Sequence, residues 1–532
     1  MPALMQRTPL TLSLVFDRLR TVHADGQLHG VDGTTTYGAF AERVLRLARA
    51  LTDELGVRPG DRVATFATNT VHHLELYYAV PLIGAVLHTV NIRLFDEQVA
   101  WMIDHAGDEV VFVDGDLVDR LASMAPELAG VRRFVRLGDG PTEGLPGLTD
   151  HDELVAAHDP AETLPRLDED AALGLCYTSG TTGQPKGVLT SHRAMILHAF
   201  ATCMADHIGL RERDVVLPIV PMFHAFGWGL PYAAPFTGAE LSFHGGDHTA
   251  AHLVGTLARD RVTVAAAVPT IWRTVLPELR ATPAAHEALR LVFVGGAASP
   301  RSLIEAYDDL GVEYLQVWGM TETGPLAAAS RPRRRHLDLD RDGQLDVRAR
   351  TGTIFAGLEA RITRDDGTEV AWDGASVGEL EVRGPWIASG YLGVDATDRF
   401  HDGWLRTGDL ATVEHDGLLR IVDRAKDLVK SGGEWISSVE LENHLVAHPE
   451  VLEAAVVGVT SRRWDERPVA VVVPRDPSAP PSLEALHGFL AERVARWWLP
   501  DRIVVVDALP KTGVGKLDKR TVREQLADLV LD

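Results

Sequence analysis

Cysteine is scarce in this chain, and no apolar run is long enough to cross a membrane. Only Cys176 and Cys203 occur, and neither lies in a Cys-x-x-Cys pair or near a His at zinc-ligand spacing. We therefore expect neither a disulfide scaffold nor a structural zinc site. The longest membrane-like stretch without charge, residues 225–239, is shorter than the about 18 residues of a span and contains Pro231 and Pro235. No transmembrane helix is expected.

Positive charge is also in deficit. The 52 Lys and Arg residues face 75 Asp and Glu residues, which gives a formal net charge of −23. Such a field repels nucleic acid and anionic membrane surfaces, so a polyanionic ligand must be held by local positive groups. Near the N-terminus a single Arg precedes the apolar residues 9–16, and no small-residue cleavage site follows. We expect a cytoplasmic protein without a nucleic-acid partner.

The composition is that of a globular protein large enough for several folding units. Hydrophobic residues make up 45% of the 532 positions and charged residues 24%, close to the average of globular domains. Strand-like apolar runs at residues 62–66, 109–113 and 132–137 alternate with amphipathic helical segments, one of which begins at Tyr37 and ends before Gly56. This alternation favours parallel sheets, so we expect an α/β architecture over about the first 420 residues.

The elements become shorter after about Asp423. Strand-like runs occur at residues 451–459, 468–473 and 502–506, and a helix is predicted over residues 483–497. This part of the chain therefore predicts a separate α+β domain of roughly 100 residues.

Residues 178–187 form a loop that is rich in glycine and hydroxyl side chains and follows a short apolar strand. It holds one Ser, three Thr, three Gly and Lys186 within ten positions. Glycines allow close approach of the backbone, so successive N–H groups and hydroxyls can point at phosphate oxygens while Lys186 adds positive charge. The segment is not a Walker A loop, because the GxxxxGK[ST] register from Gly180 has Pro185 in place of glycine and Gly187 in place of Ser or Thr. We predict a triphosphate cradle without P-loop chemistry.

The sequence Thr-Ser-Gly-Thr-Thr-Gly-Gln-Pro-Lys-Gly at 178–187 agrees at nine positions with one known signature. On this motif the chain resembles the adenylate-forming (AMP-binding) superfamily, in its medium- and long-chain fatty acyl-CoA synthetase branch. Further landmarks occur in the order that the superfamily has, across nearly the whole chain. They are Val220–Trp228, Val268–Trp272, Val317–Gly324, Gly403–Leu410, Asp423–Trp435 and Pro510–Lys516.

The resemblance implies an α/β fold with a large N-terminal domain of parallel and mixed sheets with helices, followed by a small mobile α+β C-terminal domain. The implied boundaries are residues 1–424 for the large domain, 425–428 for a hinge and 429–532 for the small domain. Lys426 stands where the family hinges. Rotation of the small domain about this point would remove Lys516 from the site and open the way for a thiol.

The resemblance also implies two half-reactions. A carboxylate attacks the α-phosphate of ATP to give acyl-AMP and pyrophosphate, and a thiol then attacks the acyl carbon. Negative charge builds on oxygen in both transition states, so catalysis should depend on fixed positive charge and oriented donors. The expected inputs are ATP, Mg²⁺, coenzyme A and a medium-chain, long-chain or bulky hydrophobic carboxylic acid.

Several residues are candidates for the nucleotide and metal site by this resemblance. Glu322 and the Thr178 hydroxyl are the expected Mg²⁺ ligands, since magnesium takes carboxylate and hydroxyl oxygens. Asp409 suits the ribose hydroxyls and Arg424 offers a rigid donor fork, although an Asp–Arg pair alone more often forms a surface ion pair. Trp318 replaces the Tyr that usually stacks on adenine. The expected ATP and AMP contacts are Thr178, Ser179, Gly180, Thr181, Thr182, Gly183, Trp318, Gly319, Thr321, Asp409 and Arg424.

Four residues are expected to be catalytic by the same resemblance. Lys516 follows the glycines of a C-terminal loop and should bridge the α-phosphate and the carboxylate, whereas the residue taken alone would be interpreted as a solvated lysine. The other three are Lys186, Glu322 and His224. The expected coenzyme A channel consists of Lys430, Gly432, Gly433, Glu434 and Trp435.

His224 and Trp228 are four residues apart, a spacing typical of an aromatic pair on the buried face of a helix. In long-chain relatives the corresponding His borders the pantetheine route and the Trp gates the acyl tunnel. Here Phe226 and Gly227 stand between them, where those relatives carry Asn-Ala. Small side chains after a strand are expected to leave volume for the acyl chain. They are Gly295, Gly296 and Ala297.

Three alternatives stay open at this point. An acyl-AMP ligase would hand the acyl group to a carrier-protein phosphopantetheine or to a partner enzyme, and the motifs barely discriminate that thiol from coenzyme A. Luciferase-type oxidation starts from the same adenylate. A non-catalytic nucleotide- or acyl-binding protein is the third, but a pure binder needs no lysine aimed at a transition state. Assembly as a homodimer is also open.

Overall fold

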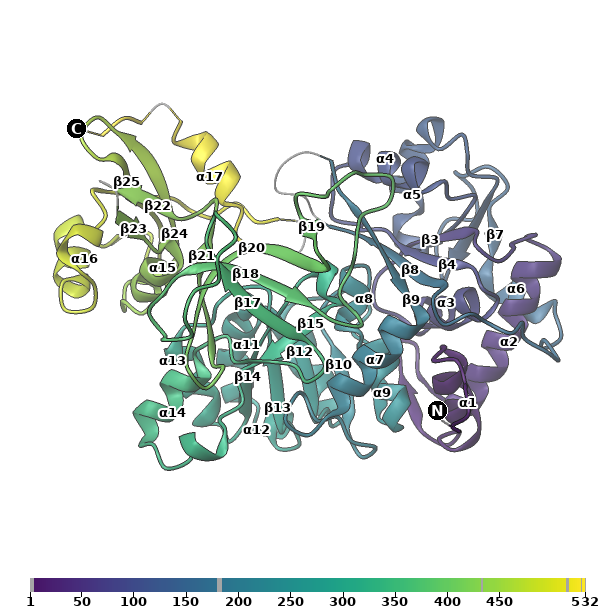
Figure 1. Cartoon of the computed structure of the whole chain (residues 1–532). Helices are drawn as coiled ribbons and strands as arrows, with labels where there is room; N and C mark the ends of the chain where they lie inside the picture. The colour runs from purple at the N-terminus through teal and green to yellow at the C-terminus, as the bar shows by residue number, and fades with distance from the viewer. Residues whose placement is uncertain (1–3, 179–183, 432–433, 513–515, 528, 532) are drawn as a thin grey trace.

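The computed structural model describes residues 4–178, 184–431, 434–512, 516–527 and 529–531 of the chain (Figure 1). Residues 4–424 are called the large domain below, and residues from 429 onward the small domain. Figure 1 shows the small domain at the upper left, beside the antiparallel strands that end the large domain, while the N-terminal helices lie at the far right. The predicted α/β architecture with a smaller α+β domain at the C-terminus is confirmed.

The first sheet is built from the N-terminal third of the chain. Its strand order is β7–β6–β5–β3–β4–β8–β9, and neighbours run parallel except for β8 and β9. β5 is buried along its whole length, as an uninterrupted apolar run predicts for a strand that is covered on both faces. The strands are β3 Arg62–Phe66, β4 Val86–Thr89, β5 Val110–Asp114, β6 Arg133–Leu137, β7 Thr149–Asp150, β8 Ala172–Tyr177 and β9 Gly187–Ser191.

The second sheet has a parallel centre and antiparallel edges. Its order is β16–β15–β14–β13–β12–β10–β11–β1–β2, with parallel pairing from β1 through β14 and antiparallel pairing at β2, β15 and β16. The strands are β1 Gln27–His29, β2 Thr34–Thr36, β10 Val215–Pro218, β11 Glu240–Ser242, β12 Val264–Ala267, β13 Leu291–Val294, β14 Glu313–Gly319, β15 Leu326–Ala329 and β16 Thr353–Ile354.

The described residues form two further sheets, one in the last part of the large domain and one in the small domain. The sheet of the large domain is antiparallel, with the order β17–β18–β20–β19 and β21 paired to β20. The small domain has the order β23–β22–β25–β24, with β26 parallel to β25. The strands are β17 Glu359–Thr363, β18 Gly378–Arg383, β19 Phe400–His401, β20 Trp404–Val413, β21 Leu419–Arg424, β22 Val429–Ser431, β23 Glu434–Ile436, β24 Val451–Ser461, β25 Asp465–Pro474 and β26 Arg502–Val505.

Helices cover the sheets, and the largest buried apolar cluster joins helices to strands of both large sheets (Figure 1). In the large domain they are α1 Ser13–Thr21, α2 Tyr37–Asp53, α3 Val71–Leu82, α4 Asp96–Ala106, α5 Val118–Ser123, α6 His151–Ala156, α7 His192–Cys203, α8 Ala225–Trp228, α9 Leu230–Thr237, α10 Ala250–Arg259, α11 Pro269–Ala281, α12 Pro283–His286, α13 Arg301–Asp308 and α14 Arg341–Arg348. Those of the small domain are α15 Ser438–Val446, α16 Leu483–Leu490 and α17 Lys519–Gln525.

One predicted helix is shorter than expected. The helix predicted over residues 483–497 ends at Leu490, and a 3-10 turn follows at Arg496–Trp498. Leu486 and Leu490 are its buried side chains, whereas the residues beyond them are mostly exposed. The helix therefore stops where it has no further apolar face to bury.

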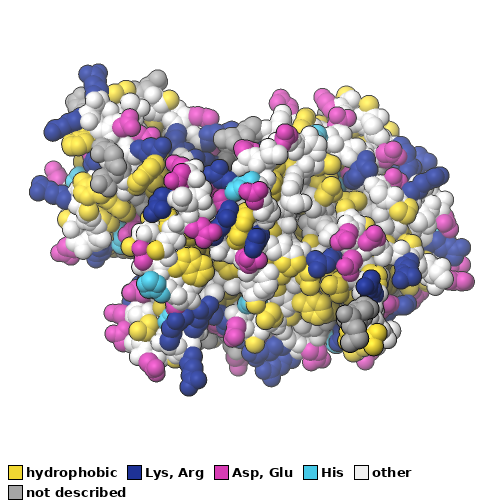
Figure 2. All heavy atoms as spheres, in the orientation of Figure 1, with side chains coloured by type: hydrophobic (Ala, Val, Ile, Leu, Met, Phe, Trp, Pro, Cys, Tyr) yellow, Lys and Arg dark blue, Asp and Glu magenta, His cyan; other side chains and the backbone are white. Residues whose placement is uncertain are grey.

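The surface mixes both signs of charge. Figure 2 shows Lys and Arg side chains interspersed with Asp and Glu over the visible face. Among the described residues, no helix is both long enough and apolar enough to span a bilayer.

Buried ion pairs tie three helices of the large domain together. Glu75 on α3 is 1% exposed and contacts Arg43 on α2 (2.5 Å) and His151 on α6 (3.1 Å). Burial alone would raise the pKa of Glu75, but the close contacts with His151 and Arg43 outweigh it and leave the pKa lowered. Burial likewise opposes charge on His151, yet its close contacts with the Asp152 and Glu75 carboxylates raise the pKa of the imidazole.

Glu75→Gln should destabilise the fold by about 3 kcal/mol, because it removes the buried negative charge that Arg43 and His151 both contact. The Glu75 contribution exists above the ordinary Glu pKa near 4.3 and is lost as the pH falls through the lower folded value. The His151 contribution exists below the ordinary His pKa near 6.5 and is lost as the pH rises through the raised folded value. In urea unfolding, the difference in free energy of unfolding between wild type and Glu75→Gln should therefore be largest near pH 6.

Glu42→Gln is the matched control. Glu42 lies on α2, and its exposed carboxylate pairs with Arg46 four residues away, so its loss should cost less than about 0.5 kcal/mol. Equal free energies of unfolding for Glu75→Gln and Glu42→Gln at pH 6 would contradict the buried network.

Candidate active site

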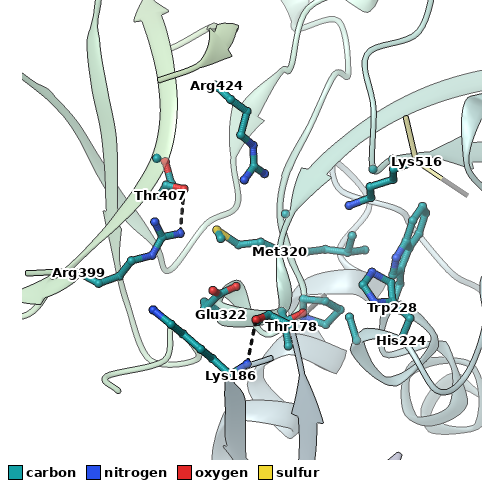
Figure 3. A pocket seen from close by; sticks show the side chains of 18 of the residues that line it. Thr178, Lys186, His224, Trp228, Met320, Glu322, Arg399, Thr407, Arg424 and Lys516 are labelled. Atoms are coloured by element: carbon teal, nitrogen blue, oxygen red, sulfur yellow. Dashed lines mark hydrogen bonds between the residues drawn. The ribbon is translucent and has the colours of Figure 1, made fainter. Parts of the chain in front are cut away.

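A cavity of about 360 Å³ lies where the two domains meet (Figure 3). Its walls bring together residues that are more than 300 positions apart in the chain. The predicted site residues that line it are Thr178, Lys186, His224, Trp228, Gly295, Gly296, Gly319, Thr321, Glu322, Arg424, Lys426 and Lys516.

Lys516 is the small domain's contribution to this cavity. Its backbone is held by reciprocal bonds with Thr512, whose N–H donates to the Lys516 carbonyl (2.7 Å) and whose hydroxyl accepts from the Lys516 N–H (3.2 Å). The side chain passes so close to Gly296 that a Cβ there would lie 2.9 Å from its Cε. Burial lowers the pKa of Lys516 to about 8, with help from the charge of Arg424 and against Asp409 and Glu322. The solvated lysine that the sequence alone suggested is therefore not what the structure shows.

Thr178, Lys186 and Glu322 lie together on one side of the cavity (Figure 3). Thr178 directly follows β8 and Lys186 directly precedes β9, and their backbones pair through Thr178 N–H to the Lys186 carbonyl (2.9 Å). Glu322 stands in a 3-10 turn after β14 and is 5% exposed. Its Oε1 accepts a hydrogen bond from the Tyr391 hydroxyl (2.6 Å), and the Lys186 ammonium lies 5.0 Å from the centre of the Tyr391 ring.

Asp409 and Arg424 form an ion pair between neighbouring strands. They are directly opposite each other on β20 and β21, with 2.7 Å between Arg424 Nε and Asp409 Oδ1. Asp409 is 3% exposed, so this is not the surface pair that the sequence left open. The other oxygen, Oδ2, accepts a hydrogen bond from the indole Nε1 of Trp318 at the end of β14 (2.9 Å). Trp318, on a strand of the second sheet, thus donates the hydrogen bond that fixes the Asp409 carboxylate of the antiparallel sheet.

His224 and Trp228 flank a left-handed turn, not the right-handed helix that their spacing predicts. The φ angles are 45° at Ala225, 51° at Phe226, 57° at Gly227 and 56° at Trp228. This conformation costs about 1–2 kcal/mol for each residue with a side chain. All four residues are buried, so tight packing supports the strain. Such strain clusters at functional sites.

The turn directs both side chains toward the cavity (Figure 3). Trp228 packs beside Phe293, with 6.0 Å between the ring centres. A Cβ on Gly295 would lie 3.2 Å from the Trp228 indole, so this glycine makes room for the tryptophan. Burial, with the charges of Lys516 and Arg93, lowers the pKa of His224 to about 3, which keeps its imidazole neutral at pH 7.

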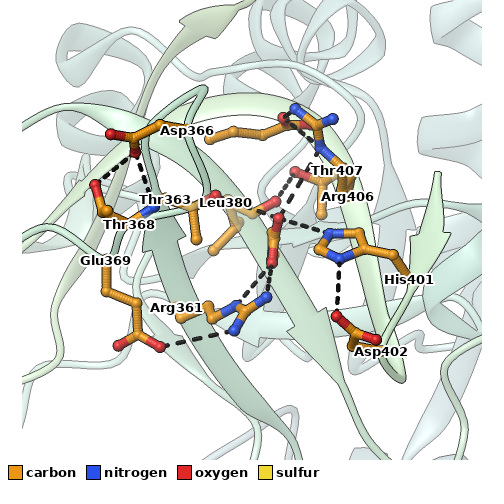
Figure 4. Close-up of polar contacts among 12 residues, drawn as sticks. Arg361, Thr363, Asp366, Thr368, Glu369, Leu380, His401, Asp402, Arg406 and Thr407 are labelled. Carbon is orange, nitrogen blue, oxygen red and sulfur yellow. Dashed lines mark hydrogen bonds and ion pairs between the residues drawn. The ribbon is translucent and has the colours of Figure 1, made fainter. Parts of the chain in front are cut away.

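Strand β20 is held rigidly where it carries site residues. The Thr407 hydroxyl donates to the Leu380 carbonyl (2.7 Å), and the Gly408 N–H donates to Glu379 (3.0 Å). Elsewhere in the same sheet, Arg361 on β17 and His401 on β19 both contact the buried Glu381 on β18 (Figure 4). These cross-strand bonds fix the backbone that precedes Asp409.

Some predicted residues lie elsewhere. Ala297 borders a separate interdomain space of about 120 Å³, whereas Trp318 and Asp409 stand behind Arg424 and do not line the cavity itself. Lys430 and Trp435 pair on the β22–β23 hairpin, with 5.0 Å from the ammonium to the ring centre, and do not line the cavity either. The remaining predictions lie outside the described residues or side chains: Ser179, Gly180, Thr181, Thr182, Gly183, Gly432, Gly433 and Glu434.

The cavity also contains residues that the motifs did not single out. Tyr391 and Arg399 stand in the long connection between β18 and β19. Met320 and Thr407 also line the cavity; they lie within two of the landmark motifs but were not among the predicted site residues. Burial, then the charge of Glu322, raises the pKa of Tyr391 well above its ordinary value, so its hydroxyl remains a donor. No periodic pattern marks these positions, because their role comes from tertiary contacts.

The AMP-binding enzyme family model matches residues 17–392, and the model of the AMP-binding enzyme C-terminal domain matches residues 440–516. The chain belongs to the AMP-binding enzyme family. The resemblance identified from the motifs is confirmed, and so is the prediction of an ATP-dependent enzyme of this family. The match of the second model coincides with most of the small domain.

Two relatives and one solved structure illustrate the family. The chain is 42% identical to the 3-methylmercaptopropionyl-CoA ligase of Ruegeria pomeroyi over 99% of each chain. It is 39% identical to the medium-chain-fatty-acid–CoA ligase of Ectopseudomonas oleovorans, covering 99% of this chain and 98% of the relative. The anthranilate CoA ligase AuaEII shares the fold with a TM-score of 0.87 at 24% identity, over 99% of this chain and 100% of the other.

Trp318→Phe should weaken nucleotide binding by about tenfold. It keeps an aromatic face but removes the N–H that orients the Asp409 carboxylate, and a lost bond to a charged group costs about 1.5 kcal/mol. The measurement is ATP affinity by calorimetry, with the melting temperature as a check on folding. Trp497→Phe, on the exposed surface of the small domain, is the matched control. Equal ATP affinity in all three proteins would show that Trp318 does not act through Asp409.

Proposed function

We propose that this enzyme is an AMP-forming acid–thiol ligase, which activates an apolar carboxylic acid with ATP and transfers the acyl group to coenzyme A. The observation that carries the proposal is the entry of Lys516 from the small domain into a cavity that the large domain lines with Lys186, Glu322 and Arg424. Cations from two domains converge there around space for a ligand. The CoA-ligase names of the relatives at 42% and 39% identity support the same reaction.

In the first half-reaction a carboxylate oxygen of the acid attacks the α-phosphorus of ATP. The bond to the β-phosphate breaks, and pyrophosphate leaves with the electron pair. Lys516 is proposed to neutralise charge on the acid and the α-phosphate, where it increases most. Asp409 is proposed to accept hydrogen bonds from the ribose hydroxyls, with Arg424 holding this carboxylate in place.

The residues present fit a magnesium ion. Glu322 offers a buried carboxylate with one oxygen bonded to Tyr391, and Thr178 offers a hydroxyl at the end of β8. Magnesium takes such oxygen ligands together with phosphate oxygens and water. When bound, it would offset the charge of the triphosphate, while Tyr391 keeps the Glu322 side chain oriented.

The acid is proposed to enter beside Trp228. The cavity wall there consists of Trp228, Val317 and Leu326, which offer apolar surface. The two relatives described above are named for a 3-methylmercaptopropionyl group and for medium-chain fatty acids. We therefore propose an unbranched apolar acid of short or medium chain as the first class to test, with longer or bulkier acids as the second.

In the second half-reaction the small domain is proposed to rotate about Lys426, within the hinge of residues 425–428. Lys426 lies in the connection between β21 and β22, two residues after Arg424, and it lines the cavity. Rotation would withdraw Lys516 and bring the hairpin with Lys430 and Trp435 toward the acyl-AMP. The neutral His224 imidazole would then border the incoming thiol.

An acid screen tests the proposed function. ATP–pyrophosphate exchange is measured with acids of two to sixteen carbons, and product formation is then assayed with coenzyme A and, separately, with a phosphopantetheinylated carrier protein. We expect exchange with a subset of apolar acids and thioester formation with coenzyme A. Transfer to the carrier protein alone would assign the enzyme to the acyl-AMP ligases, and absence of exchange with every acid would contradict ligase chemistry.

The charge state of Lys516 should be visible in the pH profile. Because its pKa is about 8 in the free enzyme, kcat/KM for ATP should fall as the pH rises through that value. Lys516→Arg keeps its charge at high pH, so the variant should lose this fall even if its rate is lower. A wild-type profile that stays flat to pH 10 would contradict the role of the ammonium.

Two variants should separate the half-reactions. Lys516→Ala should slow pyrophosphate exchange by roughly 10²–10³-fold, as the loss of one charge-stabilising donor does, and leave conversion of synthetic acyl-AMP with coenzyme A nearly unchanged. Lys426→Pro fixes φ near −65° at the hinge and should do the reverse. Parallel losses in both assays for both variants would refute the domain rotation while leaving the adenylation chemistry intact.

A further inference from the structure

Arg399 is a cationic side chain in the cavity that the motifs do not explain. It lies just before β19, and its carbonyl accepts the Arg406 N–H of β20 (2.9 Å). Figure 3 shows the guanidinium extending into the cavity on the side of Lys186 and Glu322, away from Lys516 and Trp228. Its backbone is thus fixed to the strand that carries Asp409.

The guanidinium itself is held in one position. Its Nη2 donates to the Thr407 carbonyl (3.0 Å), and Thr407 is fully buried. A Cβ at position 408 would lie only 3.2 Å from Arg399 Nη1, so Gly408 leaves the space that the guanidinium occupies. A fixed planar fork is suited to bidentate recognition of a phosphate.

The positive charge of Arg399 has no acidic partner within the described part of the chain. Arg424, on the other side of the cavity, is neutralised by Asp409 at 2.7 Å, whereas no carboxylate of the described residues lies within 4 Å of the Arg399 nitrogens. Its Nε is buried and makes no hydrogen bond to any described residue. A partly buried cation with an unsatisfied donor and no acidic partner is costly unless an anion joins it.

The hydroxyl of Tyr391 links Arg399 to the proposed metal ligand. Tyr391 donates to Glu322 (2.6 Å), and the Arg399 guanidinium lies beside the same phenol oxygen. Arg399, Lys186 and Glu322 therefore surround one region of the cavity. Arg424, with Asp409 behind it, and Lys516 surround another.

We propose that Arg399 binds the β- and γ-phosphates of ATP and holds the pyrophosphate as it leaves. The proposal rests on the adenylation chemistry proposed above, in which the oxygen that bridges the α- and β-phosphates of ATP takes the electron pair of the broken P–O bond and becomes a terminal oxygen of pyrophosphate. Charge thus increases on the leaving group, and a fixed guanidinium there stabilises it. The AMP part of the nucleotide would lie nearer Asp409 and Arg424, beyond the reach of Arg399.

Calorimetry with separate fragments of ATP tests this assignment. Wild-type protein, Arg399→Gln and Arg399→Lys are titrated with inorganic pyrophosphate plus magnesium chloride and, separately, with AMP. We expect pyrophosphate to bind 10–100-fold more weakly to Arg399→Gln and to an intermediate extent to Arg399→Lys, while AMP affinity stays within twofold. Arg383→Gln is the matched control, since Arg383 lies on the adjacent β18 and pairs with the exposed Glu359.

Kinetics distinguish a failure of this proposal from a failure of the proposed function. Arg399→Gln should raise the KM for pyrophosphate in exchange, with conversion of acyl-AMP and coenzyme A to thioester as fast as in wild type. Unchanged pyrophosphate affinity, or an equal loss of AMP affinity, would overturn the role of Arg399 while wild-type exchange upheld the ligase. Absence of exchange and of pyrophosphate binding in wild type would overturn both. If Arg399→Gln does not fold, the pyrophosphate and AMP affinities of Arg399→Lys test the role of Arg399 in the same way.

Discussion

The Asp409 carboxylate lies where three parts of the molecule meet. One oxygen is bound by Arg424 at the end of β21, and the other by Trp318 at the end of β14. The second sheet, the antiparallel sheet and the start of the interdomain connection are thereby joined at a single buried acid. Because Arg424 is the last residue of β21, the ion pair fixes the point from which the small domain extends.

This arrangement explains why a distant lysine can enter the cavity. The antiparallel sheet is cross-linked by Thr407, Glu379 and Glu381, so its edge is a firm base for the small domain. Lys516 then reaches across to Gly296, which follows β13 of the second sheet. Burial of its ammonium costs free energy, and an anionic ligand in the cavity would offset that cost.

Much of the framework could be predicted from the sequence. Short strand-like runs predicted β3, β5 and β6 to within a residue, and β5 is buried along its whole length because a strand covered on both faces needs continuous hydrophobic sequence. The motifs named Lys186, Glu322, Arg424 and Lys516, and these four residues line one cavity.

Other features could not be predicted, since they arise from contacts between distant residues. The bond from Trp318 to Asp409 joins positions 91 apart, and Arg399 enters the cavity from a connection without periodicity. The turn at Ala225–Trp228 has the spacing of an ordinary helix, but its hand is opposite. Packing of buried side chains overrides local preference there, and no sequence pattern records it.

The left-handed turn also limits how the acid preference of this enzyme can be redesigned. Side chains at positions 225, 226 and 228 face the core and the cavity, so they are natural targets for directed evolution of the substrate range. A β-branched residue is strongly disfavoured at positive φ, so Val, Ile and Thr are poor choices at these three places whatever their volume. Libraries built on unbranched residues, or on Asn and Gly, would retain the turn and explore pocket shape without unfolding its wall.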